Sequence, residues 1–170
     1  MKSMVMLDLE TMGTSSDSAI ISIGAVAFDE NSVYDRFSVN VHLQTCIDAG
    51  MVVDGGTVEW WLNQSDEARG SLLKNRVSIQ TALAEFKKWF EDSGADEVWG
   101  NGAMFDNTIF GNAYKRCGMQ IPWKFWNDRC YRTLKNIYTG IDFERVGTHH
   151  SAVDDAETQA LHLIKILKSI

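Results

Sequence analysis

The stretch that decides the expected fold is SMVMLDLE at residues 3–10, an apolar run that ends in two acids. The run predicts a buried β-strand. Residues i and i+2 of a strand point to the same face, so the carboxylates of Asp8 and Glu10 are expected to converge. Two like charges behind an apolar run are costly unless a cation compensates them. A lone Asp-x-Glu is still more often a strand end whose acids face solvent, so this pair needs further support.

Two more strands are predicted directly after the first. Residues 12–18 are rich in Gly, Ser, Thr and Asp, which is typical of a loop. The apolar stretch AIISIGAVAF at 19–28 and the alternating stretch VYDRFSVNVH at 33–42 then predict strands. The short connections between these segments favour an antiparallel meander.

The chain after about residue 57 is predicted to be mostly helical. Its clearest helix spans 78–92, with Ser78 as N-cap and an apolar stripe on one face. The further elements expected are a strand at 96–101, a helix near 105–117, a strand at 125–130, a helix at 131–139 and a last helix at about 152–168. Three strands followed by alternating helices and strands predict a mixed sheet with helices packed on it, in one domain over residues 1–170.

The composition is typical of a folded globular protein. Hydrophobic residues make up 45% of the chain and charged residues 23%, which argues against a disordered segment. The three cysteines form no Cys-x-x-Cys pair, so neither a zinc ribbon nor a disulfide framework is expected, and a reducing, cytoplasmic compartment fits best. No apolar run approaches the roughly 20 residues of a membrane span, and no secretory signal is predicted.

The net charge of −7 argues against a protein that coats long nucleic acids, because such proteins normally present a basic face. Four carboxylates gathered at one metal site would account for more than half of that charge. Two bound dications would offset it locally. Such a protein would hold a short nucleic-acid end with few phosphate contacts and a shallow salt dependence.

Two further acidic motifs follow along the chain. WGNGAMFDN at 99–107 places Asp106 just after a predicted strand, at the start of a helix. HHSAVDDAETQ at 149–159 places a histidine before a helix that carries Asp154 and Asp155 in its first turn. Taken alone, each motif has an ordinary interpretation, because the helix dipole favours acids in a first turn and histidines are common on surfaces. The order of all three motifs is more specific.

Asp-x-Glu-Thr near the N-terminus, an Asp in the middle and His-x4-Asp on the last helix resemble the DEDDh 3′–5′ exonucleases. That group contains proofreading subunits, oligoribonuclease and RNase T, and the resemblance covers essentially the whole chain. It implies that the catalytic and metal-binding set is Asp8, Glu10, Asp106, His150 and Asp155.

Three stretches resemble one branch of this group more closely, the branch of phage exonuclease A and RNase AS. They are GTVEWWLNQSDEAR at 56–69, VWGNGAMFDN at 98–107 and KFWNDRCYRTL at 124–134. The branch contains deoxyribonucleases and ribonucleases, so the choice between RNA and DNA stays open. Two positions depart from the pattern: Gly102 stands where many relatives carry Asn, and Cys130 where the branch often has Asp.

The register of the third motif depends on the family pattern. His149 precedes Asp154 by the same five residues that separate His150 from Asp155, and helical periodicity does not choose between the pairs. The family pattern His-x-Ala-x-x-Asp-Ala selects His150 and Asp155, because the two alanines then fall into place. Asp154 is therefore expected to be a solvated neighbour.

The resemblance also implies the fold and the cofactors. The fold would be an RNase H-like α/β fold, with a five-stranded mixed sheet and helices on both faces. Two divalent ions, Mg²⁺ or Mn²⁺, suit an all-oxygen ligand set. By resemblance, Asp8 would bridge both ions, Glu10 and Asp155 would complete the first, and Asp106 would support the second. His150 would take a proton from the attacking water.

Substrate contacts are expected from backbone, aromatic and polar groups. By resemblance, the backbone of Thr11 and Met12 would meet the terminal sugar, with Met12 as an apolar wedge beside the last base. Aromatic side chains can stack on bases, although at least half of the five candidates are expected in the core. These five are Trp60, Trp61, Trp99, Phe105 and Trp126. Polar candidates are Asn101 and Arg129, and Arg129 and Arg132 would either hold a phosphate or pair with acids.

The expected activity is removal of nucleoside monophosphates from single-stranded 3′ ends of RNA or DNA. Two alternatives remain: a nucleic-acid-binding module with a degenerate site, and a phosphodiesterase that acts on small nucleotides with the same metals. Dimers are common among relatives, so a homodimer is a further, open expectation. No membrane partner is expected.

Overall fold

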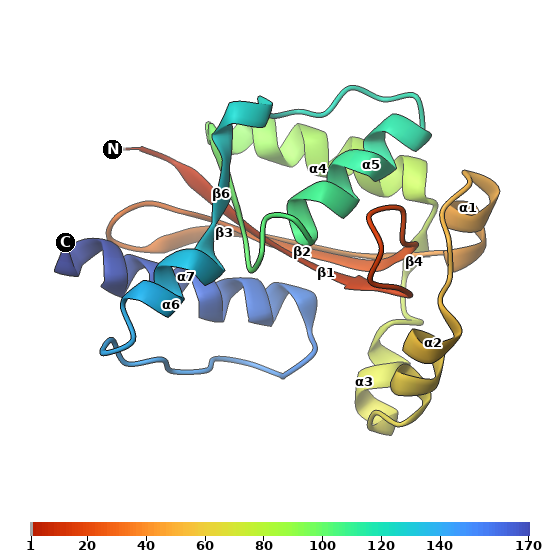
Figure 1. Cartoon of the computed structure of the whole chain (residues 1–170). Helices are drawn as coiled ribbons and strands as arrows, with labels where there is room; N and C mark the ends of the chain where they lie inside the picture. The colour runs from red at the N-terminus through yellow and green to blue at the C-terminus, as the bar shows by residue number, and fades with distance from the viewer. Residues whose placement is uncertain (1) are drawn as a thin grey trace.

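A six-stranded mixed sheet with helices on both faces forms the protein, for which a computed structural model describes residues 2–170 (Figure 1). The strand order is β4-β3-β2-β1-β5-β6. Its centre is the expected antiparallel meander of β1 (Met4–Thr11), β2 (Ile20–Phe28) and β3 (Val33–Val41). The predicted mixed α/β architecture is therefore confirmed.

Three strands run parallel to one another at one side of the sheet. β5 (Glu97–Gly100) pairs with β1, and β6 (Asp128–Cys130) pairs with β5, both in parallel. Their carboxyl ends consequently meet at one edge, which is where ligands bind in sheets of this kind. At the opposite side, β4 (Arg76–Val77) pairs with β3 and brings the count to six strands instead of the expected five. Two residues are too few to show an alternating pattern, so the sequence did not reveal this strand.

The long helices lie close to where they were expected. α4 (Ile79–Ser93) begins after Ser78, whose side chain accepts from the Thr81 N–H as predicted. α5 (Asp106–Arg116), α6 (Tyr131–Ile137) and α7 (Ala152–Ser169) each agree with their predicted bounds to within two residues. Within residues 2–170, no helix has the length and apolarity required to cross a bilayer.

The shorter elements differ more from expectation. The helical region after residue 57 consists of α2 (Gly55–Leu62) and α3 (Asp66–Ser71), and α1 (Leu43–Asp48) precedes them. These three helices gather at one end of the sheet (Figure 1). The expected strand at 125–130 begins as a 3-10 turn, η1 (Phe125–Asn127), before β6.

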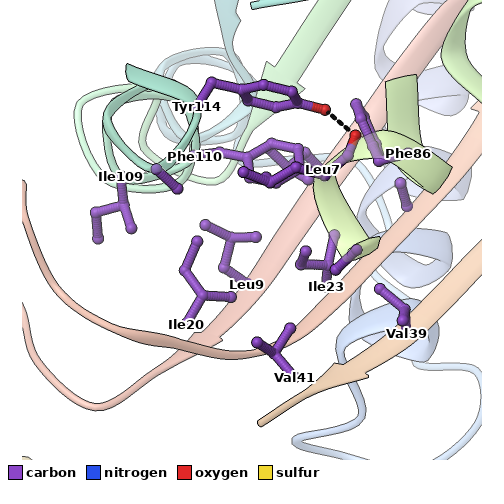
Figure 2. Packing of buried hydrophobic residues seen from close by; sticks show 14 of the residues in the cluster. Leu7, Leu9, Ile20, Ile23, Val39, Val41, Phe86, Ile109, Phe110 and Tyr114 are labelled. Carbon is purple, nitrogen blue, oxygen red and sulfur yellow. Dashed lines mark hydrogen bonds between the residues drawn. The ribbon is translucent and has the colours of Figure 1, made fainter. Parts of the chain in front are cut away.

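The side chains of β1 alternate between two cores. Leu7 and Leu9 face α4 and α5, where Phe86 and Phe110 pack edge to face with their ring centres 4.7 Å apart (Figure 2). Met4 and Met6 point to the other face, against α7. Since side chains two apart share a face, the strand carries Asp8 and Glu10 onto the α7 side as well.

Helix α7 touches the sheet at Gly24. This glycine lies on β2 directly opposite Asp8 in the β1–β2 ladder. A Cβ at Gly24 would lie 2.1 Å from backbone atoms of both Ala152 and Val153, at the start of α7. Only glycine permits this approach, so Gly24 allows the first turn of α7 to lie beside Asp8.

We predict that Gly24→Ala lowers the free energy of unfolding by about 1–3 kcal/mol or more. This is the usual cost of overpacking, and here the added methyl group would clash with backbone atoms. Urea unfolding would measure the change. Gly70→Ala in α3 is the matched control: its Cβ meets nothing within 4 Å, so we expect no loss and a gain of up to about 1 kcal/mol. Equal stability of the two variants would show that α7 does not rest on the sheet at Gly24.

Candidate active site

Three carboxylates converge where β1 ends beneath the first turn of α7. Asp8 and Glu10 come from β1 and Asp155 from α7, and each offers an oxygen within 4.8 Å of the others. Gln159, one turn further along α7, donates from Nε2 to Asp8 Oδ1 at 2.9 Å. The structure thus brings together three of the four carboxylates that the sequence singled out.

The fourth carboxylate, Asp106, reaches the same edge from the first residue of α5. Strand β5 ends opposite Leu7, and two residues later the N–H of Leu9 donates to Asp106 Oδ1 at 3.1 Å. Asp106 is only 3% exposed. The Asn101 N–H and the Arg132 guanidinium also lower its pKa, so both lie close to it.

The electrostatics of this cluster favour a cation. Burial raises the pKa of Glu10 to about 8, and repulsion by Asp155 and Asp106 adds to the effect. Burial raises the pKa of Asp106 to about 7 even though hydrogen bonds and Arg132 oppose the shift. Burial and the charges of Asp106 and Glu10 also raise the pKa of Asp8 well above its ordinary value. Crowded carboxylates of this kind are stabilised by a bound cation, and an all-oxygen set fits Mg²⁺ or Mn²⁺.

Two histidines stand beside Asp155. The rings of His149 and His150 are 3.8 Å apart, and His149 Nδ1 lies 3.7 Å from Asp155 Oδ1. His150 adopts a left-handed backbone conformation with φ 63°, which is uncommon for a residue other than glycine. Its ring meets that of Trp60 edge to face at 5.1 Å. Burial and the neighbouring His149 lower the pKa of His150.

A pocket of about 420 Å³ opens beside Glu10, between the β1–β2 loop and α2. Three of the predicted substrate residues line it: Thr11, Trp61 and Phe105. Trp61 is 5% exposed and its indole Nε1 donates to the Thr11 carbonyl at 3.0 Å, so it is a fixed wall. Trp60 also lines the pocket and is 44% exposed, which leaves a ring surface free for stacking.

Other predicted contacts lie elsewhere. The Met12 N–H donates to Ala19 and its carbonyl accepts from Asp54, while its side chain packs behind the pocket against the cluster of Ile21, Trp61 and Leu72. Arg129 pairs with Glu97 at 2.7 Å. Asn101 uses both its oxygens to accept from Arg132 and lines no part of the pocket.

The aromatic candidates are more exposed than expected. We expected at least half of the five in the core, but only Trp61 and Trp99 are buried, while Phe105 is half-buried and Trp60 and Trp126 are exposed.

Two residues of the site were not identified from the sequence. Gln159 had a usable signal, because it follows Asp155 by four residues and so shares its helix face. Arg145 forms an ion pair with Asp155 from the loop before α7. A single arginine in an irregular loop carries no periodic signal, so only the tertiary structure identifies it.

A mixed sheet with Asp8, Glu10 and Asp106 at the ends of parallel strands and Asp155 on the last helix matches the DEDDh class of 3′–5′ exonucleases. The comparisons with known proteins agree. The sequence model of the 3′–5′ exoribonuclease Rv2179c-like domain family matches residues 3–167, and the chain belongs to this family. It is therefore a 3′–5′ exonuclease, and exonucleases of the DEDDh family generally use divalent metal ions.

Two relatives share sequence with the chain. The exodeoxyribonuclease of Enterobacteria phage T4 is 28% identical over 155 residues, which cover 75% of this chain and 68% of the phage protein. The PolC-type DNA polymerase III of Caldanaerobacter subterraneus is 28% identical over 176 residues, which cover 98% of this chain but 12% of the polymerase.

Solved structures share the fold at low identity. The nuclease domain of 3′hExo, a DEDDh family member bound to rAMP, matches with a TM-score of 0.65 and 13% identity, over 99% of this chain and 92% of that one. Exonuclease I of E. coli in complex with a dA16 oligonucleotide matches with a TM-score of 0.67 and 15% identity, over 99% of this chain and 41% of that one. These likenesses confirm the expected RNase H-like fold.

The raised pKa values predict how stability depends on pH without metal. In the unfolded chain, Glu10 and Asp106 return to ordinary values of 4.5 and 3.8. Their raised folded pKa values mean that protons favour the folded state, so this stabilisation is complete below about pH 4 and is lost as pH rises through about 7–8. We therefore expect urea unfolding in EDTA to show greater stability at about pH 5 than at about pH 8.

Two controls accompany this measurement. Mg²⁺ or Mn²⁺ should reduce the difference between the two pH values, because the cation compensates the ionised carboxylates. Asp8→Asn should reduce it in EDTA, because it removes one of the crowded charges. Stability in EDTA that does not fall between these pH values would contradict the prediction.

Proposed function

We propose that residues 1–170 act as one exonuclease domain that hydrolyses single-stranded nucleic acid from its 3′ end to nucleoside monophosphates. The observation that carries this proposal is the convergence of Asp8, Glu10 and Asp155 within 4.8 Å, with Asp106 at the same strand ends. The pocket of about 420 Å³ beside Glu10 supports it, since it offers one nucleotide a concave site with aromatic walls.

The carboxylates are suited to hold two divalent cations, Mg²⁺ or Mn²⁺. Asp8, Glu10 and Asp155 would hold one ion, and Asp8 with Asp106 the other. When bound, such ions stabilise the charge that develops on the attacking and leaving oxygens of a phosphodiester. Gln159 orients Asp8 through its amide, and the Leu9 N–H orients Asp106. These neutral donors fix the ligands without adding to the crowded charge.

His150 is the proposed general base. Its lowered pKa keeps the imidazole neutral at neutral pH, so that it can accept a proton from the attacking water. The ring of Trp60 packs against it edge to face and restricts its orientation. Trp60 also borders the pocket. The residue that supports the proposed general base therefore lies where the terminal nucleobase of the substrate would stack.

The relatives support a nucleic-acid polymer as substrate without choosing between RNA and DNA. The family is described as exoribonuclease, the phage relative is an exodeoxyribonuclease, and exonuclease I was solved with single-stranded oligonucleotides. A degenerate binding module would bind such strands without turnover. A small-nucleotide phosphodiesterase would cleave only the shortest substrates. The homodimer and the cytoplasmic location stay predictions.

The first test is digestion of 5′-labelled single-stranded RNA and DNA of equal sequence with Mg²⁺ or Mn²⁺. We expect a ladder that shortens from the 3′ end and is abolished by EDTA. Asp8→Asn and Asp155→Asn should lower kcat on the order of 10²–10³-fold or more, the usual cost of removing one group that stabilises transition-state charge.

Asp154→Asn is the matched control for Asp155→Asn. Asp154 accepts from the Thr148 N–H at 2.9 Å, which an amide oxygen can still do, so activity should be nearly unchanged. Binding without shortening would favour the degenerate module. Cleavage confined to oligonucleotides below about five residues would favour the small-nucleotide alternative.

The role of His150 has its own test. We expect His150→Gln to lower kcat by roughly 10²–10⁴-fold, the usual contribution of a general base, and to remove the rise of rate with pH. In the unaltered protein, that rise should level off near neutral pH, because the pKa of His150 lies below its ordinary 6.5. A greater loss in His149→Gln than in His150→Gln would assign the role to His149.

A further inference from the structure

Arg132, on the first turn of α6, lies beside the carboxylate cluster and forms no ion pair with an acid in residues 2–170. Its Nη2 donates to the Asn101 carbonyl at 2.7 Å, and its Nε lies 3.4 Å from Asn101 Oδ1. Both acceptors are neutral. Across residues 2–170, Arg132 forms no salt bridge, although its charge is near enough to Asp106 to lower the pKa of that carboxyl.

Gly102 makes room for this guanidinium. Its φ of +99° is one that L side chains rarely adopt, and a Cβ there would lie 3.3 Å from Arg132 Cζ and 3.5 Å from both Nη atoms. The departure from the family pattern at Gly102 therefore has a physical consequence in this chain. The planar guanidinium lies against a bare backbone and is held in a defined orientation, with Nη1 making no hydrogen bond to residues 2–170.

The sheet order places Arg132 on one side of the cluster and the pocket on the other. The pocket lies mainly between the end of β1, the β1–β2 loop and α2, with Phe105 as its wall toward β5. Moving across the parallel strand ends, β1 carries Asp8 and Glu10, β5 leads into Asn101, Gly102 and Asp106, and β6 leads into Arg132. A single-stranded nucleic acid whose last nucleotide fills the pocket would place its cleaved phosphate at the carboxylates. The chain on the 5′ side of that phosphate would continue toward Arg132.

We propose that Arg132 binds the backbone phosphate on the 5′ side of the cleaved one, an inference that rests on the proposed function. A guanidinium with free N–H groups suits a phosphate oxygen. In a chain of net charge −7, one oriented cation at this place would supply local attraction for a phosphate. Arg132 would thereby distinguish substrates that carry this second phosphate from those that do not.

Two dinucleotides that differ only in a 5′-phosphate test this inference, because that group stands where the second phosphate would be. The unaltered protein should show a KM about 10-fold lower for the 5′-phosphorylated dinucleotide, the effect of one charge-assisted contact. Arg132→Gln should abolish this preference by raising KM for the 5′-phosphorylated dinucleotide to that of the unphosphorylated one. Arg132→Lys keeps the charge and should restore part of the preference.

Lys135→Gln is the matched control. It removes one positive charge from the same helix, but Lys135 lies over the ring of Phe143, 4.9 Å from its centre. We expect it to keep the preference for the 5′-phosphate. On a longer strand, the salt dependence of kcat/KM should become shallower by about 0.7 in logarithmic slope for Arg132→Gln only, the contribution of one phosphate on a single strand. Thermal unfolding of each variant checks that it is folded.

Three results would overturn the inference. The unaltered protein could lack the preference, Arg132→Gln could retain it, or Arg132→Gln could lower kcat equally on both dinucleotides, which would place Arg132 at the cleaved phosphate. A longer oligonucleotide in the same assay distinguishes failure of the Arg132 inference from failure of the proposed function. If the unaltered protein shortens it, the proposed function stands even when the inference on Arg132 fails; if it cleaves neither polymer nor dinucleotide, both fail.

Discussion

The close approach of α7 to the sheet at Gly24 is the constraint on which the site depends. The backbone of Ala152 and Val153 occupies the space that any other side chain at Gly24 would fill. Gly24 pairs with Asp8, so this contact fixes the start of α7 next to the acids of β1. Asp155, three residues into the helix, then meets Asp8 and Glu10 within 4.8 Å. A methyl group at Gly24 would push α7 away from the sheet and separate Asp155 from Asp8 and Glu10.

The same contact brings like charges together. The surrounding residues reduce the electrostatic repulsion among these carboxylates but do not remove it. Gln159 and the Leu9 N–H donate to Asp8 and Asp106, yet the pKa of each carboxyl stays raised. Arg145 pairs with Asp155 from the neighbouring loop. Crowding of these carboxylates thus lowers the stability of the metal-free fold at neutral pH, as is common at functional sites, and a bound divalent cation would offset that loss.

The long elements were predictable because they depend on local patterns. The apolar run of β1 and the apolar stripe of α4 indicate a strand and a helix by local pattern, and α4 begins after the predicted cap at Ser78. The two-residue β4 was missed because its pairing with β3 is a long-range contact with no pattern of its own. Met12 was expected at the substrate by resemblance, and Arg129 was expected either to hold a phosphate or to pair with an acid. Only the tertiary structure shows that the Met12 backbone is hydrogen-bonded to Ala19 and Asp54 and that Arg129 pairs with Glu97.

The sequence by itself determined the mixed α/β class of the fold and the acids and histidines available for catalysis. Periodicity placed Asp8 and Glu10 on one face of β1, because neighbours along a strand have fixed directions, whereas the choice of His150 and Asp155 depended on the family pattern. Tertiary structure alone decided that Arg145 joins Asp155, that Trp61 is a wall held by Thr11, and that Arg132 lies against Gly102 with no ion pair among the described residues. Each of these contacts joins residues distant along the chain, and their geometry depends on how whole elements pack.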